Sequence, residues 1–110
     1  MYTYNGARKT LKTAVISIDG ASTGTVVAAV TGKKIRVIYA SWQLTSSSST
    51  CQFFSDVTAI SHILRSSNIA SSLPVGYWWF ETAAGEPLKL QNSAGLEAQR
   101  LTGTVNYLEI

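Results

Sequence analysis

Few side chains in this sequence are of the types that carry out nucleophilic or acid–base chemistry. The sequence contains one cysteine, Cys51, and one histidine, His62. A hydrolase needs a nucleophile, a base that activates it and a group that orients the base, and nothing near these two residues supplies an orienting group or an oxyanion loop. We therefore predict that Cys51 is a packed free thiol and that His62 has a structural role.

The residues that could hold a metal ion or a phosphate are also too scattered to form a site. A lone cysteine excludes an intrachain disulfide and a Cys-based zinc site, and a lone histidine excludes a multi-His metal site. Asp19 and Asp56 fall in separate predicted loops, so a calcium site would require those loops to converge. The stretch from Gly20 to Gly24 lacks the lysine and the helix of a phosphate-binding loop. We predict no metal, no cofactor and no catalytic residue.

One pair of carboxylates deserves comparison with a glycosidase site. Glu81 and Glu86 lie close in sequence beside a run of aromatic residues, and glycosidases use two carboxylates that flank the scissile bond. Both acids flank a predicted turn, which offers no enclosed cleft for a sugar. We therefore predict that the protein is not an enzyme.

The elements that position these residues are predicted to be strands. Short runs rich in Val, Ile, Thr and aromatic residues alternate with Gly, Ser, Asn and Pro, which is typical of strands and turns. Within these runs the apolar residues recur at every second position, as at Ala14, Ile16 and Ile18. The predicted strands are Lys12–Ile18, Thr25–Val30, Lys34–Leu44, Thr50–Ser55, Thr58–Leu64, Gly76–Phe80, Pro87–Asn92 and Leu101–Ile110.

About eight short strands without helical spacing indicate an all-β protein. At 110 residues the chain has the size of a single domain, and we predict a β-sandwich of the jelly-roll or Ig-like kind over residues 13–110. Residues 1–12 form a predicted extended arm, called the N-terminal arm below. The dipeptide Thr31-Gly32 predicts a two-residue hairpin, and residues 65–72 form the longest polar connection, with a possible short helical turn.

The predicted strand Lys34–Leu44 is apolar on both faces. Strict alternation places Val37 and Tyr39 on one face and Ile38, Ala40, Trp42 and Leu44 on the other. A strand of this kind is expected at the centre of a sheet that is covered on both sides.

The aromatic run Tyr77–Phe80 would place two large rings on each face of a strand. At least one of Trp78 and Trp79 is then expected to face away from the core. The residues that we predict at an interface between subunits are Trp42, Tyr77, Trp78 and Trp79. The alternative, that all three tryptophans belong to the core of one domain, stays open because a small sandwich needs large side chains.

The net charge of +3 arises in the N-terminal arm. Arg8, Lys9 and Lys12 account for it, because the other six basic residues are balanced by six acidic ones. A nucleic-acid binder spreads basic and aromatic residues over one face, so this distribution argues against nucleic acid. A basic arm suits an acidic partner surface, although a purely solvated arm is also compatible with the sequence. No run approaches the ~18 apolar residues of a membrane span, so no membrane partner is predicted.

The C-terminal half carries a pattern that extends beyond single strands. It consists of Pro-x-Gly, an aromatic run, Thr-x-x-Gly-Glu-x-Leu-x-Leu and finally Gly-x-Val-x-Tyr, and Lys34–Ser41 adds a similar opening half. The matching positions are Pro74, Gly76, Tyr77–Phe80, Thr82, Gly85, Glu86, Leu88, Leu90, Gly103, Val105 and Tyr107. In this pattern, over about two-thirds of its length, the chain resembles small virion proteins of tailed bacteriophages.

This resemblance implies a non-enzymatic structural role. It implies a decoration (cement) protein, frequently a homotrimer, that binds the major capsid protein at the capsid surface of the virion after assembly in the host cytoplasm. Arg8, Lys9 and Lys12 are then the expected contacts of the N-terminal arm with the capsid. Related domains occur in tail fibres and spikes, which keeps a second hypothesis open. In that hypothesis the protein is a carbohydrate-binding or receptor-binding module in which exposed tryptophans stack on sugars.

Overall fold

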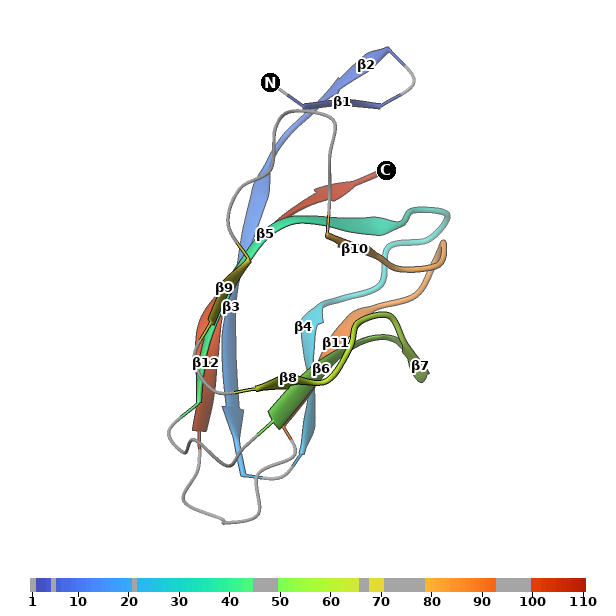
Figure 1. Cartoon of the computed structure of the whole chain (residues 1–110). Coiled ribbons are helices and arrows are strands. Elements are labelled where there is room, and N and C mark those ends of the chain that lie inside the picture. Colours follow the sequence, from blue (N-terminus) through green and yellow to red (C-terminus); the bar gives the residue numbers. More distant parts are fainter. Residues whose placement is uncertain are drawn as a thin grey trace.

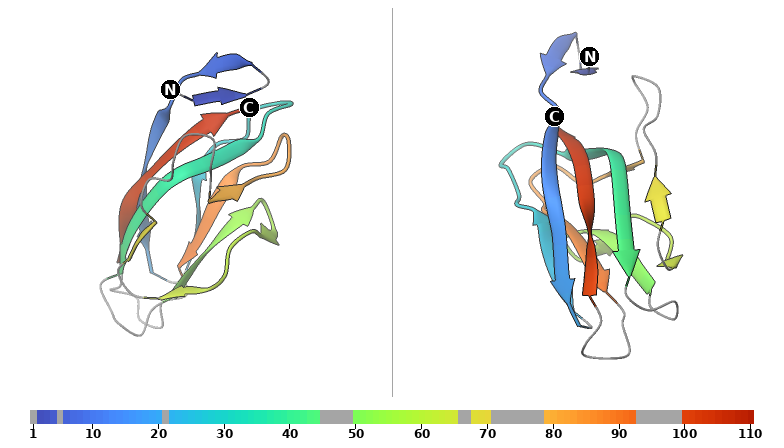
Figure 2. Two further views of the ribbon diagram at one scale, coloured as in Figure 1. Left: turned by 45° about the horizontal axis from the view of Figure 1, so that its top comes forward. Right: turned by 90° about the vertical axis from the view of Figure 1, so that its left-hand side faces the viewer.

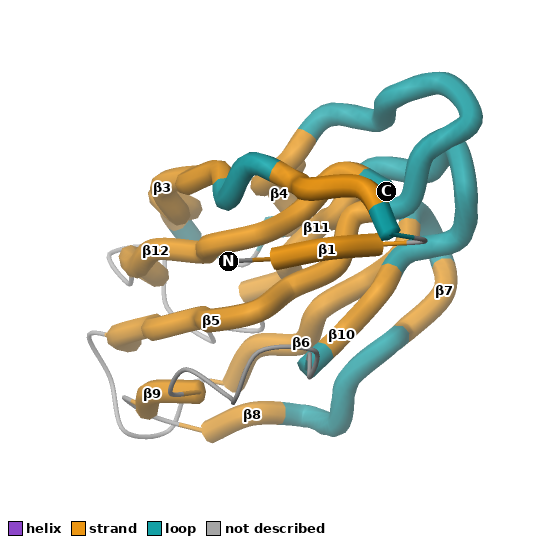
Figure 3. Tube along the Cα trace, turned by 90° about the horizontal axis from the view of Figure 1, so that it is seen from above, coloured by secondary structure: helices purple, strands orange, loops and turns teal. Residues whose placement is uncertain are grey.

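The chain folds into two facing antiparallel β-sheets, which confirms the predicted all-β sandwich (Figure 1). The structure is a computed structural model that describes residues 2–4, 6–20, 22–44, 50–65, 68–70, 79–92 and 100–110. No described segment is helical (Figure 3). The strands are β1 (Tyr2–Tyr4), β2 (Ala7–Lys9), β3 (Lys12–Asp19), β4 (Thr23–Val27), β5 (Ile35–Leu44), β6 (Thr50–Ser55), β7 (Thr58–Ala59), β8 (Leu64–Arg65), β9 (Asn68–Ala70), β10 (Phe80–Glu81), β11 (Leu88–Asn92) and β12 (Arg100–Glu109).

Each sheet is built around long strands that are distant in sequence. The first, called the β5 sheet, has the order β10-β5-β12-β3, and β9 also pairs with β5. Strands β3, β12, β5 and β9 lie side by side in the right-hand view of Figure 2. The second, called the β6 sheet, has the order β4-β11-β6-β7, and β8 also pairs with β6. Consecutive strands β3 and β4 therefore lie in different sheets.

The core fills the space between the two sheets. Alternation sends every second side chain inward, as with Ile16 and Ile18 of β3 and with Leu88 and Leu90 of β11. At the centre lies Phe53, which is fully buried. Burying an aliphatic or aromatic side chain of this size contributes about 1.5–3 kcal/mol. Packing between the inward faces is thus the main force that holds the sheets together.

The predicted faces of β5 are wrong at one end of the strand. The register between β5 and β12 shifts between Asn106 and Tyr107, where Tyr39 and then Val37 are the partners in β5. The shift leaves one additional residue in β5, and Val37 and Ala40 both contribute to the core as a result. Strict alternation had separated these two residues. The position of β5 between β12 and β10 confirms the prediction of a central strand.

Several predicted boundaries also need correction. The predicted strand 58–64 is interrupted and forms β7 and β8, and within the predicted connection 65–72 the described residues 68–70 form β9. Of the predicted strand 76–80 the structure describes residues 79 and 80, of which residue 80 belongs to β10, while residues 71–78 lie outside the described residues. Residues 45–49, between β5 and β6, also lie outside them.

The turn at Thr31-Gly32 forms, but it does not join a hairpin. The N–H of Lys33 donates to the carbonyl oxygen of Val30 at 3.0 Å, and Gly32 has a φ of 73°, which glycine adopts without steric cost. Because β4 and β5 belong to different sheets, this connection crosses between the layers.

The N-terminal arm begins with a hairpin of its own. Strands β1 and β2 pair antiparallel, with Tyr2 opposite Lys9, and Gly6 in the turn has a φ of 77°. The hairpin projects beyond the ends of the two sheets (Figures 1 and 2). Lys12, at the end of the predicted arm, already belongs to β3, where it pairs with Tyr107.

Candidate binding surface

The segment from Trp79 to Pro87 crosses from the β5 sheet to the β6 sheet and positions the candidate residues. Its first anchor is the N–H of Trp79, which donates to the carbonyl oxygen of Val37 at 2.8 Å. The ring of Phe80 stacks on Phe53 in the core at a centroid distance of 5.0 Å. The side chain of Trp79 is 40% exposed. The expectation that one of the paired tryptophans faces away from the core is thereby confirmed for Trp79.

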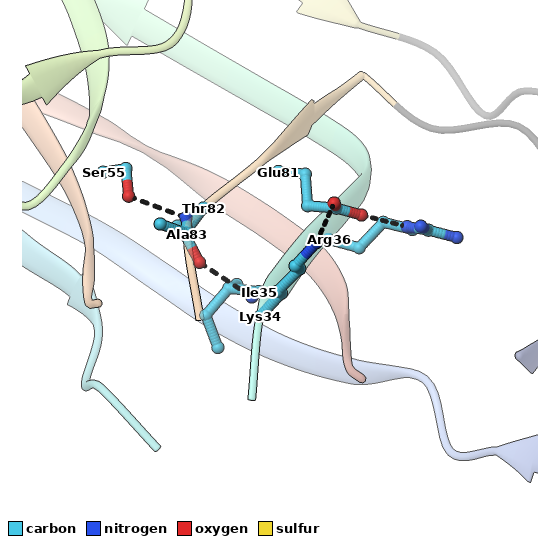
Figure 4. Close-up of polar contacts among 7 residues, drawn as sticks. All are labelled: Lys34, Ile35, Arg36, Ser55, Glu81, Thr82 and Ala83. Atoms are coloured by element: carbon cyan, nitrogen blue, oxygen red, sulfur yellow. Dashed lines mark hydrogen bonds and ion pairs between the residues drawn. The ribbon is translucent and has the colours of Figure 1, made fainter. Parts of the chain in front are cut away.

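Glu81 follows Phe80 and forms ion pairs with Arg36 of β5 and with Lys34, which directly precedes β5. The Nε of Arg36 lies 2.6 Å from one carboxylate oxygen, and the Nζ of Lys34 lies 3.6 Å from the other (Figure 4). The side chains of Arg36 and Glu81 are only 17% and 16% exposed, so this pair is better shielded from water than a surface pair. Glu81 is therefore held by charge partners and does not project freely beside the aromatic run.

The next two residues of the segment tie the sheets together by hydrogen bonds. The hydroxyl oxygen of Thr82 accepts a bond from the N–H of Ile35 at 2.9 Å, and the Thr82 side chain is buried. The hydroxyl of Ser55 accepts a bond from the N–H of Ala83 and donates to a carboxylate oxygen of Glu86 at 2.5 Å. Glu86 thus faces β6, whereas Glu81 faces β5. The two carboxylates take part in separate structural contacts.

Cys51 and His62 do not form a nucleophile and base pair. Cys51 is buried in the core at 1% exposure, whereas His62 is exposed on the connection between β7 and β8. Burial raises the pKa of the Cys51 thiol from 9.0 to about 11, which keeps it protonated and unreactive near neutral pH. Among the described residues no group of three or more His, Cys, Asp or Glu side chains could hold a metal ion. That part of the chain also contains no helix long and apolar enough to cross a membrane.

We expect the Cys51 thiol to be protected by the fold. At pH 8 a thiol reagent should modify the native protein at least about tenfold more slowly than the unfolded protein, because the thiol is both buried and less ionised. Because the pKa of the thiol is higher in the folded protein, the protonated thiol contributes to the free energy of unfolding in full below pH 9. This contribution is lost as the pH rises toward 11. Modification rates with and without denaturant measure the effect. Equal rates in the two states would contradict it.

Basic residues gather at the end of the β5 sheet that carries the N-terminal arm. Arg8 is exposed on β2, and Lys12 pairs with Glu109 at an Nζ–Oε1 distance of 3.1 Å. The backbone of Lys34 exchanges two hydrogen bonds with that of Ile110, which places the start of β5 next to the end of β12. We call this region the basic end. Its basic residues in the described chain are Arg8, Lys9, Lys12, Lys33, Lys34 and Arg36.

Sequence reasoning identified only part of the basic end. Arg8, Lys9 and Lys12 were expected there, but Lys34 and Arg36 join them only because β5 and β3 both pair with β12. No local pattern in the sequence signals that pairing. The side chains of Arg36 and Lys34 share Glu81, and Lys12 has Glu109, so the two acids offset only part of the positive charge. The surface as a whole suits an acidic partner.

Of the four predicted interface aromatics the structure describes Trp42 and Trp79. Trp42 is 5% exposed and packs edge-on against Phe53 at 6.3 Å, so it offers little area to a neighbouring subunit. Trp79 is exposed near β10. Tyr77 and Trp78 lie outside the described residues.

Comparison with known proteins gives one similarity in fold. No protein-family model matches the sequence, and no curated protein matches it. The chain is similar to a chain of the solved structure described as "Cyanophage Pam1 capsid asymmetric unit", with a TM-score of 0.50 and 17% sequence identity. The similarity covers 98% of this chain and 91% of that chain. Both chains therefore share this fold over nearly their whole lengths.

Proposed function

We propose that this protein is a non-enzymatic structural component of a tailed-phage virion, a decoration (cement) protein that binds the major capsid shell. The observation that carries the proposal is the similarity in fold to a chain of a phage capsid, which extends over 98% of this chain and 91% of that one. Because this 110-residue chain covers 91% of the matched capsid chain, that capsid chain is also small. The resemblance of the C-terminal half to small virion proteins points to the same class.

The basic end is the surface through which the protein binds the shell. Its hairpin projects from the sandwich (Figure 1) and carries Arg8 and Lys9 on β2. An isolated two-stranded hairpin is only marginally stable in water, so contact with an acidic shell surface would stabilise it. Complementary charge also steers such an encounter and fixes its orientation.

Association of the protein with itself completes the proposed arrangement. Trp79 lies at the β10 edge of the β5 sheet and is 40% exposed, and large aromatic residues are enriched at interfaces between subunits. We assign this edge, with the neighbouring Tyr77 and Trp78 in sequence, to the interface of a homotrimer on the capsid surface. Trp42 packs against Phe53 in the core, and Phe53 in turn stacks on Phe80 of β10.

Charge reversal in the hairpin tests capsid binding. The double variant Arg8→Glu/Lys9→Glu should bind shells of its own phage roughly tenfold or more weakly, because like charges then face each other. The matched control is Lys89→Glu/Arg100→Glu, which makes the same change in net charge away from the basic end. Co-sedimentation of labelled protein with shells that lack it measures the affinity at two salt concentrations.

The two variants give opposite outcomes under the proposal. Loss of binding confined to the hairpin variant, and weaker binding of the wild type at higher salt, would support it. Binding of the hairpin variant at the wild-type level, or equal losses in both variants, would refute the assignment of this end to the shell.

The carbohydrate-binding hypothesis depends on the same exposed ring of Trp79. A sugar platform normally carries a free polar side chain beside the ring, and the neighbouring acid, Glu81, is held by Arg36 and Lys34 instead. This arrangement favours the capsid role over the sugar-binding role.

A further inference from the structure

Strand β3 is a long, regular strand at an edge of the β5 sheet. On one side it pairs with β12 over eight residue pairs, from Lys12 opposite Tyr107 to Asp19 opposite Arg100, without a bulge. On its other side no described strand pairs with it, because the nearby β4 belongs to the β6 sheet. One row of its backbone N–H and C=O groups is therefore available to another strand.

This edge lacks the features that normally prevent strands from adding to a sheet. Its sequence, KTAVISID, contains no proline, and the only charges are Lys12 at one end and Asp19 at the other. Between them the outward face presents Thr13, Val15 and Ser17, and the side chain of Val15 is 75% exposed. The opposite face is covered by the domain itself, since Ile16 is in the core.

We propose that β3 pairs with β3 of a second copy of this chain, antiparallel, about a two-fold axis through Val15. Residues directly opposite each other in an antiparallel pair share a face. In this register Val15 faces Val15 of the second copy, and Thr13 and Ser17 face each other on either side. Each valine then covers the apolar side chain that the single chain leaves in water, and the two β5 sheets become one continuous sheet.

The side chains along the strand favour a second copy over a charged foreign strand. In the antiparallel register Val15 meets Val15 and the short polar side chains of Thr13 and Ser17 meet each other. The charges at the two ends, Lys12 and Asp19, are already held within the chain by Glu109 and Arg100, so they do not oppose the contact. The neighbouring strand β12 adds no repulsion, because its residues opposite Thr13, Val15 and Ser17 are uncharged, namely Asn106, Thr104 and Thr102. The edge is thus complementary to itself.

The contact goes beyond the proposed capsid role and uses a different surface. Strand β3 lies at the edge of the β5 sheet opposite to β10, where Trp79 is exposed. A chain can therefore make the β3 contact and the proposed trimer contact at once. On a capsid, the two contacts together would join decoration trimers into a net. The β3 contact can be tested with purified protein, independently of any capsid.

Disulfide trapping tests both the contact and its register. The natural Cys51 is buried, so Val15→Cys introduces one accessible thiol. Opposed residues of an antiparallel pair have Cα atoms ~4.5–5.5 Å apart, which suits a disulfide. Ser17→Cys is the matched control: in the proposed register it lies four residues, or ~13 Å, from its own copy on the second chain. A mixture of Thr13→Cys and Ser17→Cys proteins with different tags should again cross-link, because these positions face each other.

Under mild oxidation, Val15→Cys should give at least about tenfold more covalent dimer than Ser17→Cys. The mixed pair should give a dimer that contains both tags. Equal yields for the two single variants would overturn the proposal, as would a Val15→Cys protein that stays monomeric on non-reducing gels. A higher yield for Ser17→Cys than for Val15→Cys would place a different part of the strand at the contact and refute the register. Capsid binding of the hairpin variants decides the proposed function separately.

Discussion

Gly103→Ala should destabilise the sandwich severely, by about 3 kcal/mol or more. Gly103 lies in the middle of β12, opposite Trp42 of β5 and Ile16 of β3. A Cβ atom at this position would lie 2.0 Å from the carbonyl oxygen of Ser41 and 2.9 Å from the Cα of Trp42. The obstructing atoms are backbone, so no change of rotamer relieves the clash.

The position of β12 makes this clash costly. β12 pairs with β5 on one side and with β3 on the other, and its Leu101 and Val105 are fully buried on either side of Gly103. Any shift of the strand that accommodates a methyl group therefore disturbs both ladders and the core. Natural domains are stable by only about 5–15 kcal/mol. A loss of this size should lower the melting temperature by more than about 10 °C.

Gly24→Ala provides the matched control. The added Cβ would lie 2.9 Å from Cγ1 and 3.1 Å from Cδ1 of Ile18, which are side-chain atoms and not backbone. Neither glycine has a positive φ, so the comparison isolates the lack of space from backbone conformation. Thermal unfolding followed by circular dichroism should show a clearly smaller change for Gly24→Ala than for Gly103→Ala. Similar melting temperatures for the two variants would show that β12 can move freely and would contradict the argument.

Local alternation in the sequence predicted the long strands well. The observed β3, β5, β6, β11 and β12 lie within a residue of their predicted bounds. In each of them apolar residues alternate with polar ones or form a continuous apolar run, and such patterns depend on neighbouring residues alone. The β-sandwich could therefore be predicted from these strands together with the many turn residues between them.

Pairing between distant strands could not be predicted in the same way. The register shift beside Tyr107 changes the face of Val37, although nothing in the sequence of β5 indicates an additional residue. Thr31-Gly32 has the composition of a hairpin turn, yet its flanking strands join different sheets. The candidate surface depends on the same long-range pairing, because Arg36 and Lys34 meet Glu81 only when β10 pairs with β5.

Thr82→Val should destabilise the protein by about 1–3 kcal/mol, although valine has nearly the same shape. The hydroxyl oxygen of Thr82 accepts the bond from the N–H of Ile35 at 2.9 Å, and both side chains are buried, at 2% and 0% exposure. Valine leaves that N–H without its acceptor in a place where water cannot replace it. An unsatisfied buried donor costs the full desolvation of the group, which exceeds the small gain from one additional methyl group.

Thr82→Ser tests whether the hydroxyl or the methyl group of Thr82 matters. Serine keeps the acceptor and removes a methyl group, so it should lose less stability than valine if the hydrogen bond dominates, and more if packing dominates. Chemical denaturation at constant pH measures both variants on one scale. Because Thr82 also donates its own N–H to the carbonyl oxygen of Ile35 at 3.0 Å, loss of the side-chain bond should loosen the start of the segment that holds Trp79. Faster hydrogen exchange at Trp79 and Ile35 in Thr82→Val, but not in Thr82→Ser, would tie the exposed tryptophan to this buried contact, whereas unchanged exchange in both would separate them.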